Sequence, residues 1–279
     1  MPDFLSPGEY FYLKKSRPRK YFGQHFLAQP ATAQRIVQSA ELRDADAVVE
    51  IGPGLGALTR FILPEAKKLH LIELDREIVE YLRERIKSEE AVIYEQDALS
   101  FDFGNLFDTV KKRVVVLGNL PYSISSPLMF RLLECFPAVD RAVFMVQKEV
   151  GMRFASPPGS KDYGVLSVLL GLYSKVSILF TVGPGQFYPP PKVDSVVLRI
   201  DFAEEHPPGP GFEFIRRLVS KAFQQRRKTL ANSLAGAFGL PSAVITDACK
   251  QAACDPKRRP ETLSPKEFLA LAVLLREHT

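Results

Sequence analysis

The residues with the clearest chemical meaning form one short motif, Asn119-Leu120-Pro121-Tyr122, directly after a β-branched run at residues 114–117. An adenine amine is a poor nucleophile because its lone pair is delocalised into the ring. The side-chain oxygen of Asn119 and the backbone carbonyl of Leu120 can each accept one N–H of such an amine, which localises the lone pair. Pro121 stiffens the turn and has no N–H, and Tyr122 offers a ring face for stacking a base. The motif predicts methyl transfer to the exocyclic amine of adenine, although in isolation it also fits an ordinary strand-to-helix turn.

A glycine-rich loop, with Gly52, Gly54 and Gly56, follows another β-branched run, Ala47–Ile51. Glycines allow a sharp turn and a close approach of the backbone to a ligand, and a helix that starts nearby offers free N–H groups. Dinucleotide-binding loops have a similar spacing of glycines, so the glycines alone do not exclude NAD as the cofactor. Glu50, just before the loop, is expected to hold the loop and to favour a cationic cofactor such as S-adenosylmethionine over the anionic pyrophosphate of NAD.

Two more carboxylates follow the next two predicted strands. Glu73 lies 17 residues after Gly56, where it can accept hydrogen bonds from both ribose hydroxyls of an adenosine. Asp97 ends the following strand, where it or its neighbours can bind the adenine edge. The carboxyl ends of parallel strands meet at one edge of a sheet, where ligands bind in open α/β folds. Each carboxylate alone also fits a strand-end cap, but together with the glycine loop they predict an adenosine site.

Phe187 lies in a proline-rich segment, residues 182–193. The prolines predict an extended, rigid loop. Such a loop could place Phe187 against the second face of the target base. The alternative is a core aromatic residue beneath the loop.

The elements that must position these residues follow an alternating pattern. Short β-branched runs alternate with amphipathic segments through the first 200 residues, which predicts a mostly parallel sheet with helices on both sides. The last two of the seven strands have no long helix between them and are expected to form an antiparallel pair. The predicted strands are 47–51, 69–74, 92–95, 114–117, 142–146, 176–182 and 195–202, and the predicted helices are 32–39, 58–63, 76–86 and 126–135.

A proline- and glycine-rich stretch, residues 203–211, predicts a domain boundary. Residues 1–202 then form a domain of the Rossmann-like α/β class with a basic N-terminal arm. Residues 212–279 are expected to form a small all-helical domain. In its last helix, Ser264 is a plausible N-cap with Glu267 at the third helical position.

Positive charge is gathered in clusters near both ends of the chain, on top of a formal net charge of +5. Clusters that flank one catalytic domain favour a nucleic-acid partner, although any single cluster also fits a solvated surface. The three cysteines have no CxxC or Cys/His spacing, so we expect reduced thiols, a cytoplasmic location and no metal. The residues expected to bind RNA are Lys14, Lys15, Arg17, Arg19, Lys20, Arg226, Arg227 and Lys228.

Taken in order, these motifs closely resemble those of the ribosomal RNA adenine N6-dimethyltransferases, of the type that acts on the small subunit. The resemblance runs from about Lys20 to Leu275. It implies a class I methyltransferase fold and S-adenosylmethionine as cofactor. It further implies two methyl transfers to N6 of each of two adjacent adenosines, in the 3′-terminal hairpin loop of 16S rRNA in a late small-subunit precursor. The additional matching motifs are Gln24-His25-Phe26-Leu27, Gln96-Asp97-Ala98, Gln147-Lys148-Glu149-Val150, 222–228 and 259–264.

By the same resemblance, the cofactor contacts include a segment before the first long strand, with Gln24, His25 and Leu27. Family members often have asparagine where this chain has His25, so the contact made by this imidazole is left open. The remaining cofactor contacts implied by the motifs are Gly52, Glu73, Asp97 and Asn119.

Three other functions share some of these features. A large-subunit rRNA methyltransferase would share the cofactor motifs and Asn119-Leu120-Pro121-Tyr122, and the 226–228 and 260–261 segments argue against it. An NAD-dependent oxidoreductase would need a proton-relay residue, which the sequence does not offer. A non-catalytic assembly factor would bind RNA without turning over cofactor. No apolar stretch approaches the roughly 18 residues of a membrane span, no secretory signal is evident, and we expect a monomer.

Overall fold

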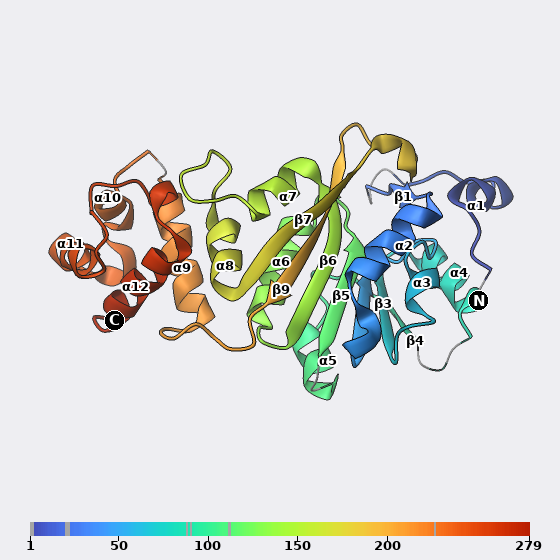
Figure 1. Cartoon of the computed structure of the whole chain (residues 1–279), viewed down its shortest axis with the longest axis horizontal. Helices are drawn as coiled ribbons and strands as arrows, with labels where there is room; N and C mark the ends of the chain where they lie inside the picture. Colours follow the sequence, from blue (N-terminus) through green and yellow to red (C-terminus); the bar gives the residue numbers. More distant parts are fainter. Residues whose placement is uncertain (1–2, 20–22, 88, 90, 111–112, 226) are drawn as a thin grey trace. The chain divides into compact units, whose positions relative to one another are not determined.

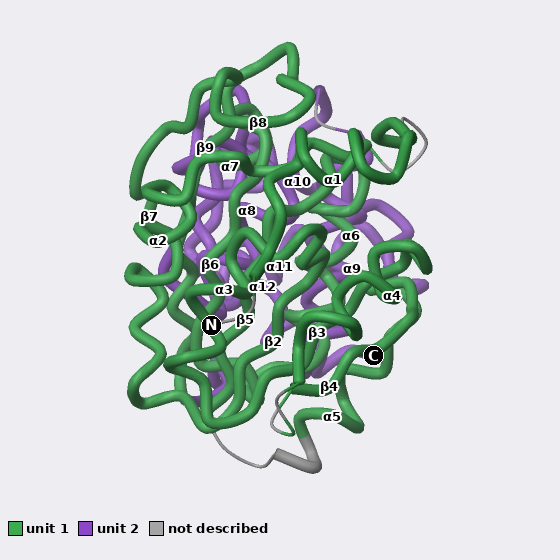
Figure 2. Tube along the Cα trace, turned by 90° about the vertical axis from the view of Figure 1, so that its right-hand side faces the viewer, with its two compact units in different colours: residues 1–151, 177–204 green, residues 152–176, 205–279 purple. Residues whose placement is uncertain are grey.

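The computed structural model describes residues 3–19, 23–87, 89, 91–110, 113–225 and 227–279. Its contacts divide the chain into two compact units, shown in green and purple in Figure 2. One unit comprises Met1–Gly151 and Ser177–Glu204, and the other Met152–Val176 and Glu205–Thr279. The change of unit at 204–205 falls in the predicted linker, but residues 152–176, which the sequence-based division assigns to the first domain, group with the C-terminal helices.

Within the described residues, seven strands form the main sheet in the order β4-β3-β2-β5-β6-β9-β7 (Figure 1). The pairs from β4 to β6 are parallel, and β9 is antiparallel to β6. This arrangement confirms the predicted mostly parallel α/β sheet. The strands are β2 (Ala47–Ile51), β3 (Leu69–Glu73), β4 (Ala91–Glu95), β5 (Val114–Asn119), β6 (Val139–Gln147), β7 (Ser174–Val182) and β9 (Ser195–Phe202).

The central strands are rich in β-branched residues, as is typical of strands whose two faces are both buried. Every residue of β2 is buried, as are the first five of β5. Alternate side chains such as Val48, Leu71, Leu117 and Val143 belong to one apolar core with residues of the helices on that side, and the intervening side chains face the opposite layer. The sheet therefore holds its strand ends rigidly.

Local sequence signals, such as an N-cap residue, mark where helices of the first unit begin. Asp75 caps α4 by accepting a hydrogen bond from the Glu77 N–H at 3.1 Å. Predicted helices at α2, α3, α4 and α6 are present. The helices are α1 (Pro7–Leu13), α2 (Pro30–Ser39), α3 (Thr59–Ile62), α4 (Arg76–Arg85), α5 (Phe103–Val110), α6 (Ser125–Glu134) and α7 (Lys148–Phe154), whose last three residues belong to the second unit, with 3₁₀ turns η2 (Leu42–Asp44) and η3 (Pro184–Gln186).

A second, two-stranded sheet joins β1 (Phe26–Leu27) to β8 (Phe187–Tyr188). The strands are antiparallel, with Phe26 opposite Tyr188 and Leu27 opposite Phe187. The Ala28 N–H also donates to the carbonyl oxygen of Gln186 at 2.8 Å. The proline-rich loop that contains Phe187 is thus attached to the segment that contains His25 and Leu27.

The second unit is helical except for the first residues of β7, Ser174–Val176. Its last helix has the predicted capping box, in which Ser264 accepts from the Glu267 N–H and the Glu267 side chain accepts from the Ser264 N–H. Its first two helices after the linker are separate, because α9 ends at Phe223 and α10 begins at Leu230. The helices are α8 (Val165–Tyr173), α9 (Phe212–Phe223), α10 (Leu230–Leu234), α11 (Ser242–Gln251) and α12 (Pro265–Arg276), with 3₁₀ turns η4 (Ala237–Gly239) and η5 (Pro260–Thr262).

Candidate functional site

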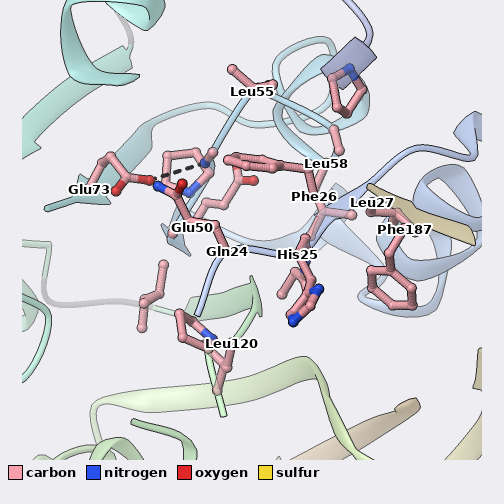
Figure 3. A pocket seen from close by; sticks show the side chains of 18 of the residues that line it. Gln24, His25, Phe26, Leu27, Glu50, Leu55, Leu58, Glu73, Leu120 and Phe187 are labelled. Carbon is pink, nitrogen blue, oxygen red and sulfur yellow. Dashed lines mark hydrogen bonds between the residues drawn. The ribbon is translucent and has the colours of Figure 1, made fainter. Parts of the chain in front are cut away.

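A cavity of about 630 Å³ opens at the carboxyl ends of the parallel strands in the first unit. It gathers residues from the ends of β2, β3, β4 and β5 and from the β1 and β8 segments. In Figure 3, Glu50 and Glu73 lie on one side of the cavity, and His25 and Phe187 on the other. The predicted residues that line the cavity are Gln24, His25, Leu27, Glu50, Gly52, Gly54, Glu73, Asp97, Asn119, Leu120, Pro121, Tyr122 and Phe187.

The glycine loop needs glycine for its backbone conformation. Gly52 and Gly54 have φ angles of +65° and +54°, which other residues rarely adopt. Gly56 has φ +81°, but it does not belong to the cavity lining, and a Cβ there would lie 2.5 Å from the Phe4 ring. Gly52 and Gly54 thus face the site, whereas Gly56 makes room for the N-terminal arm.

Glu73 is fixed at the end of β3 by three backbone N–H groups. Its Oε1 accepts from Leu74 and Asp75 at 2.9 Å each, and its Oε2 accepts from Gly54 at 3.2 Å. Burial raises the pKa of the Glu73 carboxyl, and these three hydrogen bonds oppose that shift. The carboxylate is therefore oriented before any ligand binds. Its remaining lone pairs can accept hydrogen bonds from hydroxyl groups of a ligand.

Glu50 is only 1% exposed. The hydroxyl of Thr59 donates to its Oε2 at 2.7 Å. Burial is the main cause that raises the pKa of the Glu50 carboxyl to about 8; the Thr59 hydrogen bond opposes this shift and the nearby Glu73 carboxylate adds to it. Below this pKa the carboxyl is protonated and neutral, and once ionised it favours a positive charge in the adjoining cavity.

Asp97 lies in the turn after β4. Its Oδ1 accepts from the Leu99 N–H at 2.9 Å, which fixes the side chain in the turn. Its neighbours Gln96 and Ala98 line the cavity with it. The ends of β2, β3 and β4 therefore contribute to one cavity, as the sequence predicts.

Asn119 ends β5 with a defined amide orientation. Its Nδ2 donates to the backbone carbonyl of His25 at 2.9 Å, so the amide oxygen is the group left to accept from a ligand. A Cβ on Gly118 would lie 2.6 Å from the carbonyl oxygen of Ile51, so the close approach of β5 to β2 requires glycine there. The Leu120 N–H donates to the Met145 carbonyl at 3.0 Å, which fixes the turn that follows.

Aromatic rings form the other part of the cavity. The imidazole of His25 is stacked on Tyr122, with ring centroids 5.8 Å apart. Burial raises the pKa of the Tyr122 hydroxyl, so its ring stays neutral near pH 7. Phe187 is 6% exposed and belongs to the apolar core, as one of the two alternatives predicts, and it also lines the cavity.

Gln24 lines the cavity, but its amide also holds neighbouring segments together. Its Oε1 accepts from the Arg19 N–H at 2.9 Å and its Nε2 donates to Asp75 at 3.0 Å. The guanidinium of Arg19 forms ion pairs with Asp75, at 3.2 Å, and with Glu77. Arg19 is thus occupied by carboxylates of this chain, which weakens its predicted role as a phosphate-binding residue.

Of the other predicted RNA-binding residues, some are exposed and some lie outside the described residues. Lys14, Lys15 and Arg17 are exposed at and after the end of α1, and Arg227 and Lys228 are exposed in the turn after α9. Lys20 and Arg226 lie outside the described residues.

Sequence reasoning missed the part of the site that the N-terminal arm provides. Phe4, Ser6, Pro7 and Glu9 line the cavity. The guanidinium of Arg60 donates to the Phe4 carbonyl at 3.1 Å, which holds the arm in place. The available signal was the Ser6–Glu9 capping box with Pro7 at the first helical position, which marks the start of α1.

The order of the sheet strands, the glycine loop after β2 and the carboxylate after β3 together define a class I methyltransferase, a class that uses S-adenosylmethionine. The model of the family "Ribosomal RNA adenine dimethylase" matches residues 15–274, so the chain belongs to this family. The predicted enzyme class and fold are thereby confirmed.

Comparisons with individual proteins also show similarity to rRNA methyltransferases. The chain is 44% identical to the "Ribosomal RNA small subunit methyltransferase A" of Syntrophotalea carbinolica over 94% of its length and 98% of that protein. A crystal structure of a dimethyladenosine transferase from Plasmodium falciparum superposes with a TM-score of 0.76 at 29% identity, covering 88% of this chain and 96% of that one. The 23S rRNA methyltransferase ErmE follows with a TM-score of 0.64 at 25% identity, covering 90% and 99%.

None of the described helices has the length and apolar character of a membrane span.

Proposed function

We propose that this chain dimethylates N6 of two adjacent adenosines in the 3′-terminal hairpin loop of 16S rRNA, in a precursor of the small ribosomal subunit. The observation that carries the proposal is the Asn119 amide, whose nitrogen donates to His25 and whose oxygen is thereby available at the adenosine cavity. The similarity to proteins named small-subunit methyltransferases supports this substrate over the large subunit.

The cofactor half of the cavity suits S-adenosylmethionine. Glu73 presents a pre-oriented carboxylate for the ribose hydroxyls, and Asp97 lies where the adenine edge would bind. Gly52 and Gly54 allow a close approach of the backbone, and Glu50, when ionised, favours the cationic part of the cofactor. When bound, S-adenosylmethionine supplies an electrophilic methyl carbon, whose bond to sulfur breaks as the bond to N6 forms.

The residues of this chain then act on the adenine. The Asn119 oxygen and the Leu120 carbonyl accept the two N–H groups of the amine, which localises its lone pair and directs it at the methyl carbon. Pro121 keeps the turn rigid, and Tyr122 and Phe187 cover the faces of the base. A loop adenine is already unpaired, so it enters this site at little cost. The proton of the product amine passes to solvent.

Exposed cations are proposed to bind the RNA backbone. Lys14, Lys15 and Arg17 are exposed and follow the arm residues that line the cavity, which supports a role in binding the phosphates of the substrate RNA. Arg227 and Lys228 are exposed on the second unit and are proposed to bind phosphates as well. An enzyme of this function would act in the cytoplasm, and we propose that it acts as a monomer.

The test uses labelled S-adenosylmethionine with undermethylated small and large ribosomal subunits, followed by nucleoside mass spectrometry of each rRNA. We expect N6,N6-dimethyladenosine in 16S rRNA alone. Label in 23S rRNA would indicate the large-subunit alternative, and RNA binding without any label would indicate an assembly factor. Either result would overturn the proposal.

A further inference from the structure

His25 contacts both segments that carry the aromatic residues of the site. Its Nδ1 donates to the carbonyl oxygen of Pro189 at 2.7 Å, and its ring is stacked on Tyr122 with an angle of 26° between the planes. Its backbone carbonyl accepts from the Asn119 amide. One residue therefore links the turn after β5 and the segment after β8, which lie 94 and 164 residues away in the sequence.

The hydrogen bond to Pro189 also determines which ring nitrogen carries hydrogen. A carbonyl oxygen only accepts hydrogen bonds, so Nδ1 of His25 must be a donor. One ring face is packed against Tyr122. The imidazole thus uses its Nδ1 and one of its faces within the protein, and the contacts of this side chain point to an internal link more than to a ligand of the cofactor.

The residues proposed to cover the base lie in or next to the two linked segments. Tyr122 belongs to the first segment, and Phe187 lies in β8, two residues before Pro189 and directly before the second segment. Figure 3 shows the side chains of His25 and Phe187 extending to the same side of the β1 and β8 segments. A movement of Pro189 relative to Tyr122 would change the space between the two aromatic rings.

We propose that His25 is a positioning residue that holds Tyr122 and Phe187 at the separation required by one planar base. The proposal rests on the base methylation proposed above. It gives the imidazole a positioning role towards the base, whereas the family resemblance implies a contact with the cofactor.

The second methyl transfer is the step most sensitive to this positioning. The amine of unmethylated adenine can donate two N–H hydrogen bonds to the site, whereas the monomethylated amine can donate only one and carries a bulkier substituent. Fewer hydrogen bonds then align the lone pair, so the stacking residues must provide more of the alignment. A loosened base site would release monomethylated product before the second transfer.

The surrounding structure does not depend on the imidazole. Gln186 is held by the Ala28 N–H at 2.8 Å and by the hydroxyl of Thr32, and the β1–β8 pairing uses backbone groups only. The backbone carbonyl that accepts from Asn119 is present whatever side chain occupies position 25. Variants at this position should therefore fold and keep the amide orientation.

Three variants separate the two contacts. His25→Phe keeps a ring on Tyr122 and removes the hydrogen bond to Pro189. His25→Asn keeps a donor of the right length and removes the ring, and His25→Ala removes both. His278→Ala, at an exposed histidine near the end of the chain, serves as the matched control. Each full-length variant is assayed for the Kd of S-adenosylhomocysteine by calorimetry and for single-turnover methylation of undermethylated small subunits at saturating cofactor.

We expect the cofactor Kd to stay within about twofold, while the methylation rate of His25→Ala falls by about 10- to 100-fold, the effect of a misplaced reacting group. The ratio of N6-methyladenosine to N6,N6-dimethyladenosine should rise, with His25→Phe and His25→Asn intermediate. A tenfold weaker Kd with an unchanged rate at saturation would make His25 a cofactor ligand and overturn the proposal. Unchanged rate and product ratio in all three variants would also overturn it. Failure of the proposed function itself is distinct, because the wild-type protein would then leave 16S rRNA unmodified.

Discussion

Replacing Glu50 by glutamine should make the protein more stable at neutral and alkaline pH. The carboxyl of Glu50 is buried, with its pKa raised from the ordinary 4.5 to about 8. The folded state therefore holds this proton more tightly than the unfolded state does. The stability that the proton provides is complete below about pH 4.5, falls as the pH rises towards 8, and is absent above that range.

The magnitude follows from the same two pKa values. The difference between 4.5 and about 8 corresponds to at most about 5 kcal/mol of unfolding free energy, at about 1.4 kcal/mol for each pH unit. Glutamine is isosteric with glutamate, can still accept from the Thr59 hydroxyl, and has no proton to lose. The variant should thus lack this part of the pH dependence.

The assay is urea-induced unfolding of wild type and Glu50→Gln between pH 5 and pH 9, without cofactor. The exposed Glu65→Gln provides the matched control and should follow wild type. Burial also raises the pKa of Glu73, which adds a slope of the same sign to all three proteins, so the informative quantity is the difference between variant and wild type. If that difference stays constant across the pH range, the buried-carboxyl argument is wrong.

Four further predictions concern the site and its surroundings. Asn119→Ala should lower the single-turnover rate by an amount equivalent to about 3–4 kcal/mol, as for removal of an oriented transition-state hydrogen-bond partner, with cofactor affinity retained; the exposed Asn232→Ala is the control. Gly118→Ala should destabilise the fold by about 1–3 kcal/mol in urea unfolding, because its Cβ would lie 2.6 Å from the Ile51 carbonyl oxygen. Arg227→Gln with Lys228→Gln should flatten the dependence of RNA affinity on salt by about 0.7 per lost phosphate contact in single-stranded RNA, and an unchanged slope would remove both from the interface. Calorimetry should show the affinity for S-adenosylmethionine rising relative to uncharged S-adenosylhomocysteine as Glu50 ionises near pH 8, and Glu50→Gln should lose this trend.

The main sheet could be predicted from sequence because its strands are short, β-branched and buried on both faces. Ala47–Ile51 and Ser195–Phe202 are present with the predicted bounds. The strand-end carboxylates could be placed for a related reason, since parallel strands bring Glu73 and Asp97 to one edge wherever the chain forms such a sheet.

Helices and strands whose sequences lack a hydrophobic periodicity could not be predicted in this way. The two-residue strands β1 and β8 are too short to show alternation, and they exist because Leu27 and Phe187 pair across the chain. Helix α8 is apolar almost throughout, since most of its side chains are buried, so it lacks the polar face by which amphipathic helices are recognised. Its packing against α9 and α12 is also why residues 152–176 group with the second unit.

Charge clusters were the least informative part of the sequence for the site, because a sequence shows charges without their partners. Arg19 counts towards the basic arm, yet its guanidinium pairs with Asp75 and Glu77. Arg258, in another basic stretch, pairs with Glu267. Lys14 and Lys15, in contrast, are exposed, so they remain candidates for the proposed RNA contact.

The two halves of the cavity are built by different means, and this bears on how the enzyme selects its substrate. The cofactor half follows from local features, a loop or a carboxylate directly after a strand, and any chain with this sheet can reproduce it. The base half depends on contacts between residues far apart in sequence, from Asn119 to His25 and from His25 to Pro189. Because those contacts use loops and two-residue strands, the base half can change its spacing without disturbing the sheet. Differences in RNA substrate among enzymes of this fold should therefore arise in the segments around His25, Tyr122 and Phe187, while the strand ends proposed to bind the cofactor stay the same.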